Sequence, residues 1–262
     1  MQISILGCGW LGLPLAQTLI EKGFSVNGST TSPAKTEQLK TAGINPFLIS
    51  LTANGMEGDI ANFLRGSEIL IIDIPPKLRK EQSESFTDKI KTLIPHIEAA
   101  GIAKVMFASS TAVYAEDNTV VTEETPARPE TESGKQLLEA EGLLANAKFK
   151  TTTLRFGGLV GEDRQPVKYL AGRENLENPD GPVNLIHQKD CIGIMLKIIE
   201  TDSWGEIFNA VAPYHPTREQ HYTQQATALN LPLPKFSHEK PSRGKKVSSQ
   251  KTIDVLGYVF EK

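Results

Sequence analysis

Cysteine is scarce in this chain of 262 residues, which holds only Cys8 and Cys191. Two thiols this far apart in sequence indicate neither the disulfide framework of a small secreted domain nor a metal site. Cys8 lies in a glycine-rich stretch and Cys191 in an apolar run. We therefore interpret both as reduced thiols of a cytoplasmic protein.

Long apolar runs and an excess of one charge are also lacking. No uninterrupted apolar stretch approaches the ~20 residues that a membrane-spanning helix needs. No cationic segment precedes the apolar N-terminus, so we do not interpret it as a targeting segment. The net charge of -3 favours neither nucleic acid nor an anionic membrane as a partner. No metal is expected, because four of the histidines show no ligand spacing: His96, His215, His221 and His238.

Glycine, in contrast, is placed in a specific pattern near the N-terminus. Residues 2–6 are predicted to form a buried strand that runs into Gly7, Gly9 and Gly12 at the start of a helix. In a dinucleotide-binding fingerprint the first glycine allows the tight turn, the second admits the pyrophosphate and the third lets the helix pack closely. The helix N-terminus then offers N–H groups to the phosphates. The predicted cofactor contacts here are Gly7, Gly9, Trp10, Leu11 and Gly12.

The end of the next expected strand, residues 24–29, bears on the choice of cofactor. An acidic residue at this place binds the ribose 2′-hydroxyl of NAD and repels a 2′-phosphate. This chain has no carboxylate there and instead offers Ser29, Thr30, Thr31 and Lys35. The sequence therefore favours NADP over NAD. NAD stays the less favoured alternative, since no arginine is present and hydroxyl clusters are also common in turns.

Strands and helices alternate over more than a hundred residues, which predicts an α/β Rossmann fold with a doubly wound parallel sheet. Further strands are expected at 46–51, 68–74 and 104–109, and further helices at 13–22, 33–42, 84–100 and from 130 onward. Pro75 ends the strand 68–74 and is predicted to form a wall near the cofactor, although a plain strand terminator is equally favoured. We assign residues 1–157 to the dinucleotide-binding domain and 158–262 to a smaller, partly interleaved substrate-binding region.

Four later segments carry a family resemblance. They are Phe-Ala-Ser-Ser-Thr-Ala-Val-Tyr at 107–114, Leu-Arg-Phe-Gly-Gly-Leu-Val-Gly at 154–161, Asn-Leu-Ile-His-Gln-Lys-Asp at 184–190 and Phe-Asn-Ala at 208–210. Together they resemble the extended short-chain dehydrogenases/reductases, which include sugar-nucleotide epimerases and dehydratases. The pattern G-x-G-x-x-G in place of G-x-x-G-x-x-G is similar to the atypical branch of that family. The resemblance implies a nucleotide-sugar or other carbonyl substrate and a homodimer.

The resemblance also implies a catalytic set, which this chain holds only in part. Ser110 stands at the position of the family's substrate-binding serine, with Thr111 as a substitute, and Ser109 and Lys135 are implied cofactor contacts. Lys135 matches the family lysine, which holds the nicotinamide ribose and lowers the pKa of a tyrosine four residues earlier. Thr131 stands in place of that tyrosine. An aliphatic hydroxyl has no accessible acidity near neutral pH, so Thr131 could at most orient a substrate or water.

Tyr114 is the only tyrosine nearby, and a half-buried packing residue is the favoured interpretation. The alternative is that Tyr114, Glu132 or another group transfers the proton in place of the family tyrosine. Two functions stay open: an NADP-dependent reductase or epimerase with altered proton transfer, or a catalytically inactive NADP(H) sensor.

The rest of the chain supports weaker expectations. Arg155 and Arg164 flank the glycine loop 157–161 and suit either substrate phosphates or structural ion pairs. His187 and Asp190 are expected to hold the C-terminal region. Residues 166–182 are expected to form a loop over a substrate cleft. The basic stretch 240–251 is expected to be mobile and solvated, and 253–260 to dock on the body of the protein.

Overall fold

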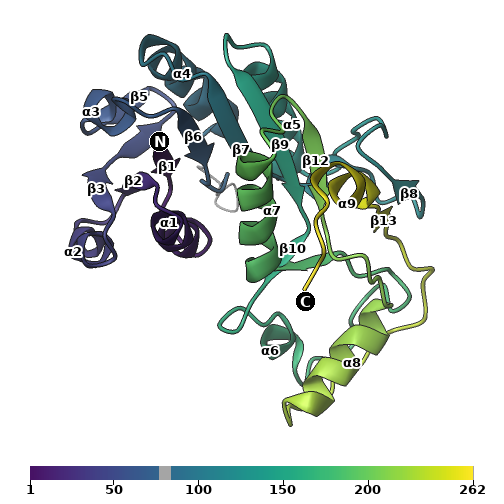
Figure 1. Cartoon of the computed structure of the whole chain (residues 1–262). Coiled ribbons are helices and arrows are strands. Elements are labelled where there is room, and N and C mark those ends of the chain that lie inside the picture. The colour runs from purple at the N-terminus through teal and green to yellow at the C-terminus, as the bar shows by residue number, and fades with distance from the viewer. Residues whose placement is uncertain (77–83, 262) are drawn as a thin grey trace.

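The computed structural model describes residues 1–76 and 84–261. Its centre is a seven-stranded parallel sheet in the order β3-β2-β1-β6-β7-β9-β12 (Figure 1). The strands are β1 (Gln2–Leu6), β2 (Ser25–Thr30), β3 (Asn45–Leu48), β6 (Ile69–Ile72), β7 (Lys104–Ser110), β9 (Lys150–Phe156) and β12 (Ile207–Ala210). The order reverses between β1 and β6, which is the doubly wound topology that the sequence predicted.

Helices cover both faces of the sheet because its central strands β1 and β6 are apolar on both sides. Ile3 and Ile5 belong to one core and Leu6 to the other, as expected for strands that alternate their side chains. The first core includes residues of α1 (Gly12–Glu21), α2 (Thr36–Thr41), α7 (Gln188–Glu200) and α9 (Gln250–Leu256). The second includes residues of α3 (Ile60–Leu64), α4 (Phe86–Ala99) and α5 (Glu132–Ala145).

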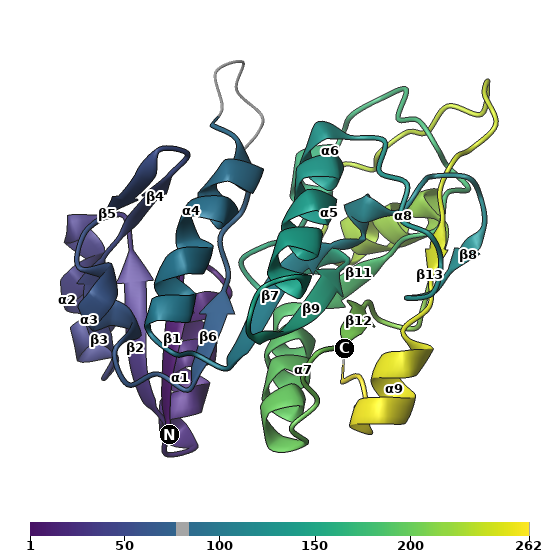
Figure 2. The same ribbon diagram turned by 90° about the horizontal axis from the view of Figure 1, so that it is seen from above.

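Shorter elements complete the chain. Three two-stranded pairs are formed by β4 (Ser50–Thr52) with β5 (Gly55–Glu57), β8 (Val120–Val121) with β13 (Lys246–Val247), and β10 (Gly158–Val160) with β11 (Leu185–His187). Two helices, α6 (Val167–Leu170) and α8 (Arg218–Ala228), pack on each other through Val167, Tyr222 and Ala226. Figure 2 shows α8 beside β11, on the side of the molecule away from α1 and α2.

Three segments differ from the sequence-based expectation. The expected strand 46–51 is divided, because β3 stays in the main sheet whereas β4 turns away to pair antiparallel with β5. The expected helix 33–42 begins with a 3₁₀ turn, Pro33–Lys35, and only then becomes α2. The loop 166–182 contains the short helix α6.

The basic stretch 240–251 is not a mobile solvated segment, so that prediction was wrong. Lys246 and Val247 form β13, which pairs with β8, and the side chain of Lys245 is only 4% exposed. Four of the five cations of this stretch form ion pairs with glutamates of distant segments, and this pairing is invisible in the local sequence. The following segment docks as expected, since the hydroxyl of Tyr258 donates to the buried Asp190 carboxylate over 2.9 Å.

The last strand of the main sheet, β12, comes from beyond residue 157 and pairs with β9. Residues of the C-terminal part therefore contribute both to the sheet and to the region around α6 and α8. The division into 1–157 and 158–262 as functional parts stays a prediction. Among the described helices, none is both long and apolar enough to cross a membrane.

Candidate cofactor and substrate site

The glycine turn follows β1 at the point where the strand order reverses. Gly7 has a φ of +108°, and an added Cβ would lie 2.3 Å from the backbone oxygen of Asp73. At Gly12 an added Cβ would lie 2.2 Å from the oxygen of Gly7. At Gly9, by contrast, an added Cβ would meet no atom within 4 Å. Two glycines are therefore required by packing, whereas the third faces open space, as the approach of a pyrophosphate requires.

A carboxyl group that the sequence analysis missed lies beside this turn. Asp73 directly follows β6, is partly buried, and its Oδ2 lies 3.2 Å from the place of a Cβ on Gly12. Burial raises the pKa of Asp73 to about 7, although the backbone N–H of Gly12 opposes the rise. Its position at the end of an apolar strand, two residues before Pro75, was the available signal. Pro75 is exposed, and its predicted contact with the cofactor stays a prediction.

The polar residues at the end of β2 have two different roles. The Ser29 hydroxyl accepts a hydrogen bond from the backbone N–H of Gly7 over 2.9 Å, so it stabilises the glycine turn itself. The Thr30 hydroxyl accepts from the N–H of Ser32 over 3.1 Å. Thr31 and Lys35 are exposed, and neither side chain bonds to any residue that the structure describes. Of the four predicted residues, these two are available to a ligand.

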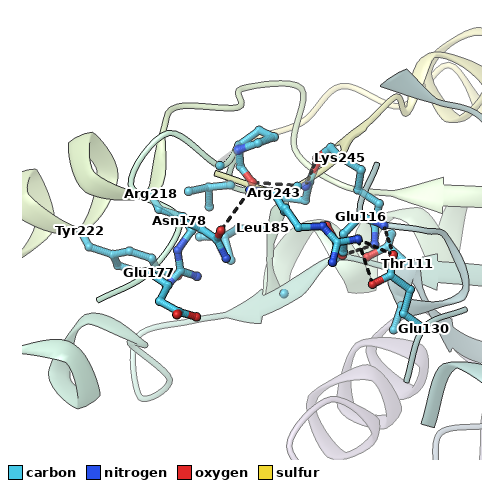
Figure 3. A pocket seen from close by; sticks show the side chains of 18 of the residues that line it. Thr111, Glu116, Glu130, Glu177, Asn178, Leu185, Arg218, Tyr222, Arg243 and Lys245 are labelled. Carbon is cyan, nitrogen blue, oxygen red and sulfur yellow. Dashed lines mark hydrogen bonds and ion pairs between the residues drawn. The ribbon is translucent and has the colours of Figure 1, made fainter. Parts of the chain in front are cut away.

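The segment after β7 forms one wall of a cleft of about 1030 Å³ (Figure 3). Ser110 and Thr111 lie in this wall, opposite residues 175–185 of the predicted cleft loop and residues 237–245 of the C-terminal segment. The Ser110 hydroxyl accepts from the N–H of Ala112 over 3.2 Å. The predicted serine is thus in the cleft, as is its predicted substitute.

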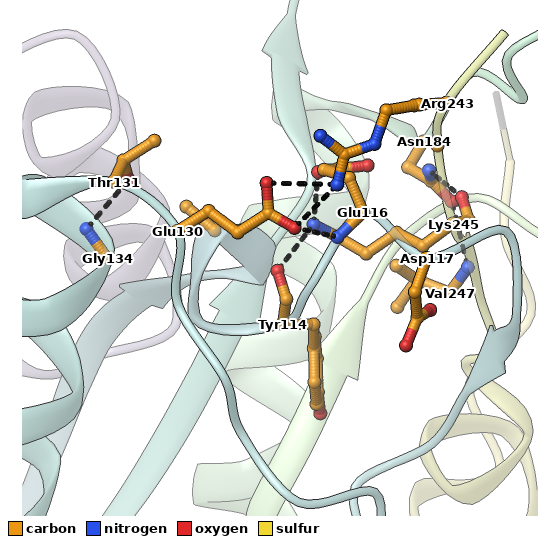
Figure 4. A network of polar contacts seen from close by, with 12 residues as sticks. Tyr114, Glu116, Asp117, Glu130, Thr131, Gly134, Asn184, Arg243, Lys245 and Val247 are labelled. Carbon is orange, nitrogen blue, oxygen red and sulfur yellow. Dashed lines mark hydrogen bonds and ion pairs between the residues drawn. The ribbon is translucent and has the colours of Figure 1, made fainter. Parts of the chain in front are cut away.

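Two ion pairs that the sequence did not reveal line the same cleft (Figure 4). Glu130 accepts from Arg243 over 3.1 Å and also from the backbone N–H of Glu116. Lys245 donates to the Glu116 carboxylate and to the backbone oxygen of Tyr114. These contacts fasten the C-terminal segment across the cleft, which explains why residues 240–251 are ordered.

The start of α5 packs against the segment that carries Ser110. An added Cβ on Gly134 would lie 2.3 Å from the backbone oxygen of Ala112. Thr131 is the N-cap of α5, and its hydroxyl accepts from the N–H of Gly134 over 3.1 Å. Lys135 is exposed one turn into the helix and forms no ion pair within the described part of the chain. The Thr131 hydroxyl is therefore engaged in capping, whereas the Lys135 ammonium is available.

Tyr114 belongs to a buried polar network and not to the cleft. Its ring is 1% exposed, and its hydroxyl donates to Asn209 over 2.9 Å and accepts from Arg155 over 2.8 Å. Burial raises the pKa of Tyr114 above its ordinary value, with Arg155 opposing the rise. The structure thus contradicts Tyr114 as a proton donor to a substrate, because the hydroxyl is enclosed and already bonded.

The same network also engages Arg155 and Ser109, two other residues that the sequence analysis singled out. Arg155 forms a buried ion pair with Glu141 at 2.6 Å, so it is a structural residue and not a phosphate ligand. The Ser109 hydroxyl donates to Glu141 over 2.6 Å. The buried Glu141 carboxylate therefore takes up the donor of the Ser109 side chain, and the predicted cofactor contact of Ser109 stays a prediction. Asp190 accepts from both Tyr258 and the N–H of Glu261, which confirms its expected role in holding the C-terminal region.

A family model described as NAD(P)H-binding matches residues 7–199 of this chain. The chain belongs to the NAD(P)H-binding family. The matched range begins at Gly7, directly after β1, and ends in α7, so it covers the glycine turn and the sheet strands β2, β3, β6, β7 and β9. The fold and this match agree with the resemblance to the atypical extended short-chain dehydrogenases/reductases, and the matched family gives the chain a pyridine-nucleotide-binding domain.

Similar proteins agree with this assignment. Protein YeeZ of Escherichia coli (strain K12) is 32% identical over 99% of this chain and 96% of its own length. A putative NAD-dependent epimerase/dehydratase from Methylobacillus flagellatus is 26% identical, with a TM-score of 0.78 over 99% of this chain and 92% of that one. UDP-glucuronic acid 4-epimerase from Bacillus cereus, solved with NAD, is 18% identical, with a TM-score of 0.81 over 100% and 92%.

Among the described residues, no three His, Cys, Asp or Glu side chains lie together as metal ligands would. Both cysteines are buried, and burial raises the pKa of Cys8 to about 12. Such a thiol stays protonated near neutral pH and is a poor nucleophile.

Proposed function

We propose that this protein binds NADP(H) at the glycine turn and a small carbonyl compound, of the nucleotide-sugar class, in the cleft that Ser110 and Thr111 line. The observation that carries the proposal is the open position at Gly9, in the middle of the dinucleotide-binding glycine pattern. The large polar cleft lined by Ser110 supports the second half of the proposal. The backbone N–H groups of Trp10 and Leu11, next to the open position at Gly9, would hold the pyrophosphate, whereas Gly7 and Gly12 shape the turn.

The preference for the 2′-phosphate rests on Thr31 and Lys35. Both are exposed beyond the carboxyl end of β2, and no acidic side chain replaces them there. Ser29 and Thr30 contribute indirectly, because their hydroxyls fix the turn and the strand end. A single lysine and a hydroxyl give modest discrimination, so we expect NADPH to bind about tenfold more tightly than NADH, by analogy with one charge-assisted hydrogen bond.

The substrate proposal rests on the lining of the cleft. Ser110 would hydrogen-bond the substrate carbonyl or hydroxyl oxygen, and Lys135 would hold the nicotinamide ribose. The Bacillus cereus structure with a similar fold is an epimerase of UDP-glucuronic acid. A cleft of about 1030 Å³ has room for a ligand of that size.

The cofactor supplies hydride chemistry when bound, but the matched proton transfer lacks its usual tyrosine. The Thr131 hydroxyl caps a helix and the Tyr114 hydroxyl is enclosed. These two contacts favour the second candidate, a catalytically inactive NADP(H) sensor. A reductase or epimerase would need another group, such as a carboxylate of the cleft, to transfer the proton in place of the tyrosine. Glu132, the other suggested substitute, is exposed on α5 and accepts from Gln136.

Binding is tested by titrating the purified protein with NADPH and NADH. Gly9→Val should abolish binding of both, because the side chain occupies the open space, whereas Gly142→Ala on α5 should leave binding unchanged. Tighter binding of NADH than NADPH would refute the 2′-phosphate argument. Binding of neither would refute the cofactor proposal.

Catalysis is tested with UDP-glucose, UDP-glucuronic acid and simple carbonyl compounds as probes. Turnover that is lost in Ser110→Ala or raised in Thr131→Tyr supports the enzyme. Tight cofactor binding without turnover in any of these variants supports the sensor. A homodimer and a cytoplasmic location stay predictions.

A further inference from the structure

A tight turn from the loop after β10 is docked on the glycine turn. The backbone groups of Gly161 and Arg164 bond to each other over 3.0 and 3.1 Å, which closes the turn Gly161–Arg164. An added Cβ on Gly161 would lie 2.8 Å from the indole ring of Trp10. The Trp10 indole N–H donates to Asp163 over 2.8 Å. Trp10 directly follows Gly9, so this turn lies against the residue next to the open position.

The contact is reinforced from a third segment. The side chain of Gln188, the first residue of α7, donates to the backbone oxygen of Trp10 over 2.6 Å. Segments far apart in sequence therefore converge on a single residue of the cofactor fingerprint. Together these contacts fix the position of the turn Gly161–Arg164 relative to Gly9.

Arg164 is the charged member of this turn, and its charge is available. Its guanidinium lies 5.1 Å from the centroid of the Trp10 ring, which holds the side chain over the glycine turn by a cation–π contact. Arg164 is exposed and forms no ion pair with any residue in the described ranges. The neighbouring Asp163 carboxylate instead accepts from Trp10. A planar guanidinium with free donors is suited to bidentate binding of a phosphate.

A cation beside the glycine turn would stabilise a bound diphosphate. A diphosphate brings two negative charges near neutral pH, and the first turn of α1 has no basic side chain. The nearest titratable group from β6 is the Asp73 carboxyl, which would repel the phosphates when ionised. The other titratable groups that the described residues bring here include the Asp163 carboxylate on Trp10, the Asp190 carboxylate, and the buried thiols of Cys8 and Cys191. Of the residues that contact Trp10, Arg164 alone carries a positive charge.

We propose that Arg164 binds the diphosphate of the dinucleotide, and that the turn Gly161–Arg164 covers this group after it enters the glycine turn. The inference rests on the proposed NADP(H) binding at Gly9. It adds a cofactor ligand from the second half of the chain, where neither the fingerprint nor the strand end of β2 would place one.

The test compares ligands that share the adenosine but differ in the diphosphate. Calorimetric titration of Arg164→Gln with NADPH and with ADP-ribose should show affinities about 10- to 100-fold weaker than in the unmodified protein, the range of a charge-assisted hydrogen bond. Any affinity for adenosine should be unchanged. Arg164→Lys should restore part of the loss, because it keeps the charge but not the fork of donors. Arg173→Gln, an exposed arginine in the loop after α6, is the matched control and should behave as the unmodified protein.

Each other outcome has one meaning. If the unmodified protein binds NADPH and Arg164→Gln binds it equally well, the assignment of Arg164 is wrong while the proposed function stands. If the unmodified protein binds no dinucleotide, the proposed function fails first. If affinity for UDP falls in Arg164→Gln while affinity for ADP-ribose does not, the arginine serves the substrate diphosphate and the inference is overturned.

Discussion

The pH dependence of stability should show whether a protonated carboxyl lies against the glycine turn. Asp73 is the group concerned, and its pKa rises from an ordinary 3.8 to about 7 because the carboxyl is desolvated. One pKa unit is worth about 1.4 kcal/mol, so ionising Asp73 in the folded protein costs at most about 4 kcal/mol. Partial exposure of the residue makes this value an upper limit.

The sign follows from proton binding. Between these two pKa values the folded protein keeps a proton that the unfolded chain has lost. The contribution of Asp73 to stability is therefore fully present below about pH 4, falls by about 1.4 kcal/mol per pH unit as the pH rises, and is lost above about pH 7. Asp73→Asn keeps the shape of the side chain and removes the titration. We expect this variant to gain stability relative to the unmodified protein as the pH rises, by up to about 4 kcal/mol between about pH 4 and pH 8.

Urea unfolding at several pH values, followed by circular dichroism, gives the free energy of unfolding for both proteins. The exposed Asp117 is the matched control. Its pKa is lowered, first by the Thr119 hydroxyl, so Asp117→Asn should change the pH dependence slightly and in the opposite direction. The reasoning is refuted if the difference between Asp73→Asn and the unmodified protein is the same at all pH values, or if it falls as the pH rises.

Three further variants test the packing around the site by urea unfolding. Glu141→Gln should lower the free energy of unfolding by about 3–5 kcal/mol, because it leaves the buried Arg155 without its charge partner. Glu124→Gln, at an exposed position, should change it very little, and equal effects of the two variants would contradict the buried pair. Thr131→Ala should lower the free energy of unfolding by about 1 kcal/mol, because α5 loses its N-cap, whereas Thr131→Ser keeps the cap and the stability. An equal loss in both variants would argue against capping. Gly142→Ala should stabilise α5 by up to about 1 kcal/mol, because an added Cβ meets no atom within 4 Å, and a loss of stability would contradict that open position.

Local patterns in the sequence were sufficient for the sheet and for the glycine turn. β1 was predicted with its observed bounds, Gln2–Leu6, because an apolar strand followed by three spaced glycines has few alternative structures. The buried run of β6 and the long helix α4 were also predicted, with ends shifted by up to two residues. These features depend on side chains that are neighbours in the chain, so their period and spacing are visible in the sequence.

The roles of individual polar side chains required the tertiary structure, because each depends on a partner far away in sequence. Tyr114 could be excluded as a proton donor only when Asn209 was found at its hydroxyl, 95 residues later. Lys245 belongs to a stretch whose composition indicated a solvated segment, yet it is buried against Glu116. No local pattern encodes such pairs, since the free energy of each arises from burial that only the complete fold creates.

The sequence by itself thus determined that the chain folds as a Rossmann sheet and that Gly7, Gly9 and Gly12 form a tight turn between β1 and α1. Through the family resemblance it also predicted that Thr131 stands in place of a tyrosine. Only the tertiary structure decided what surrounds these residues: a carboxyl at Asp73, a helix cap at Thr131 and the turn bearing Arg164 on Trp10. The physical reason is that a backbone turn is specified by the conformational limits of adjacent residues, whereas the charge of a site depends on side chains from separate segments.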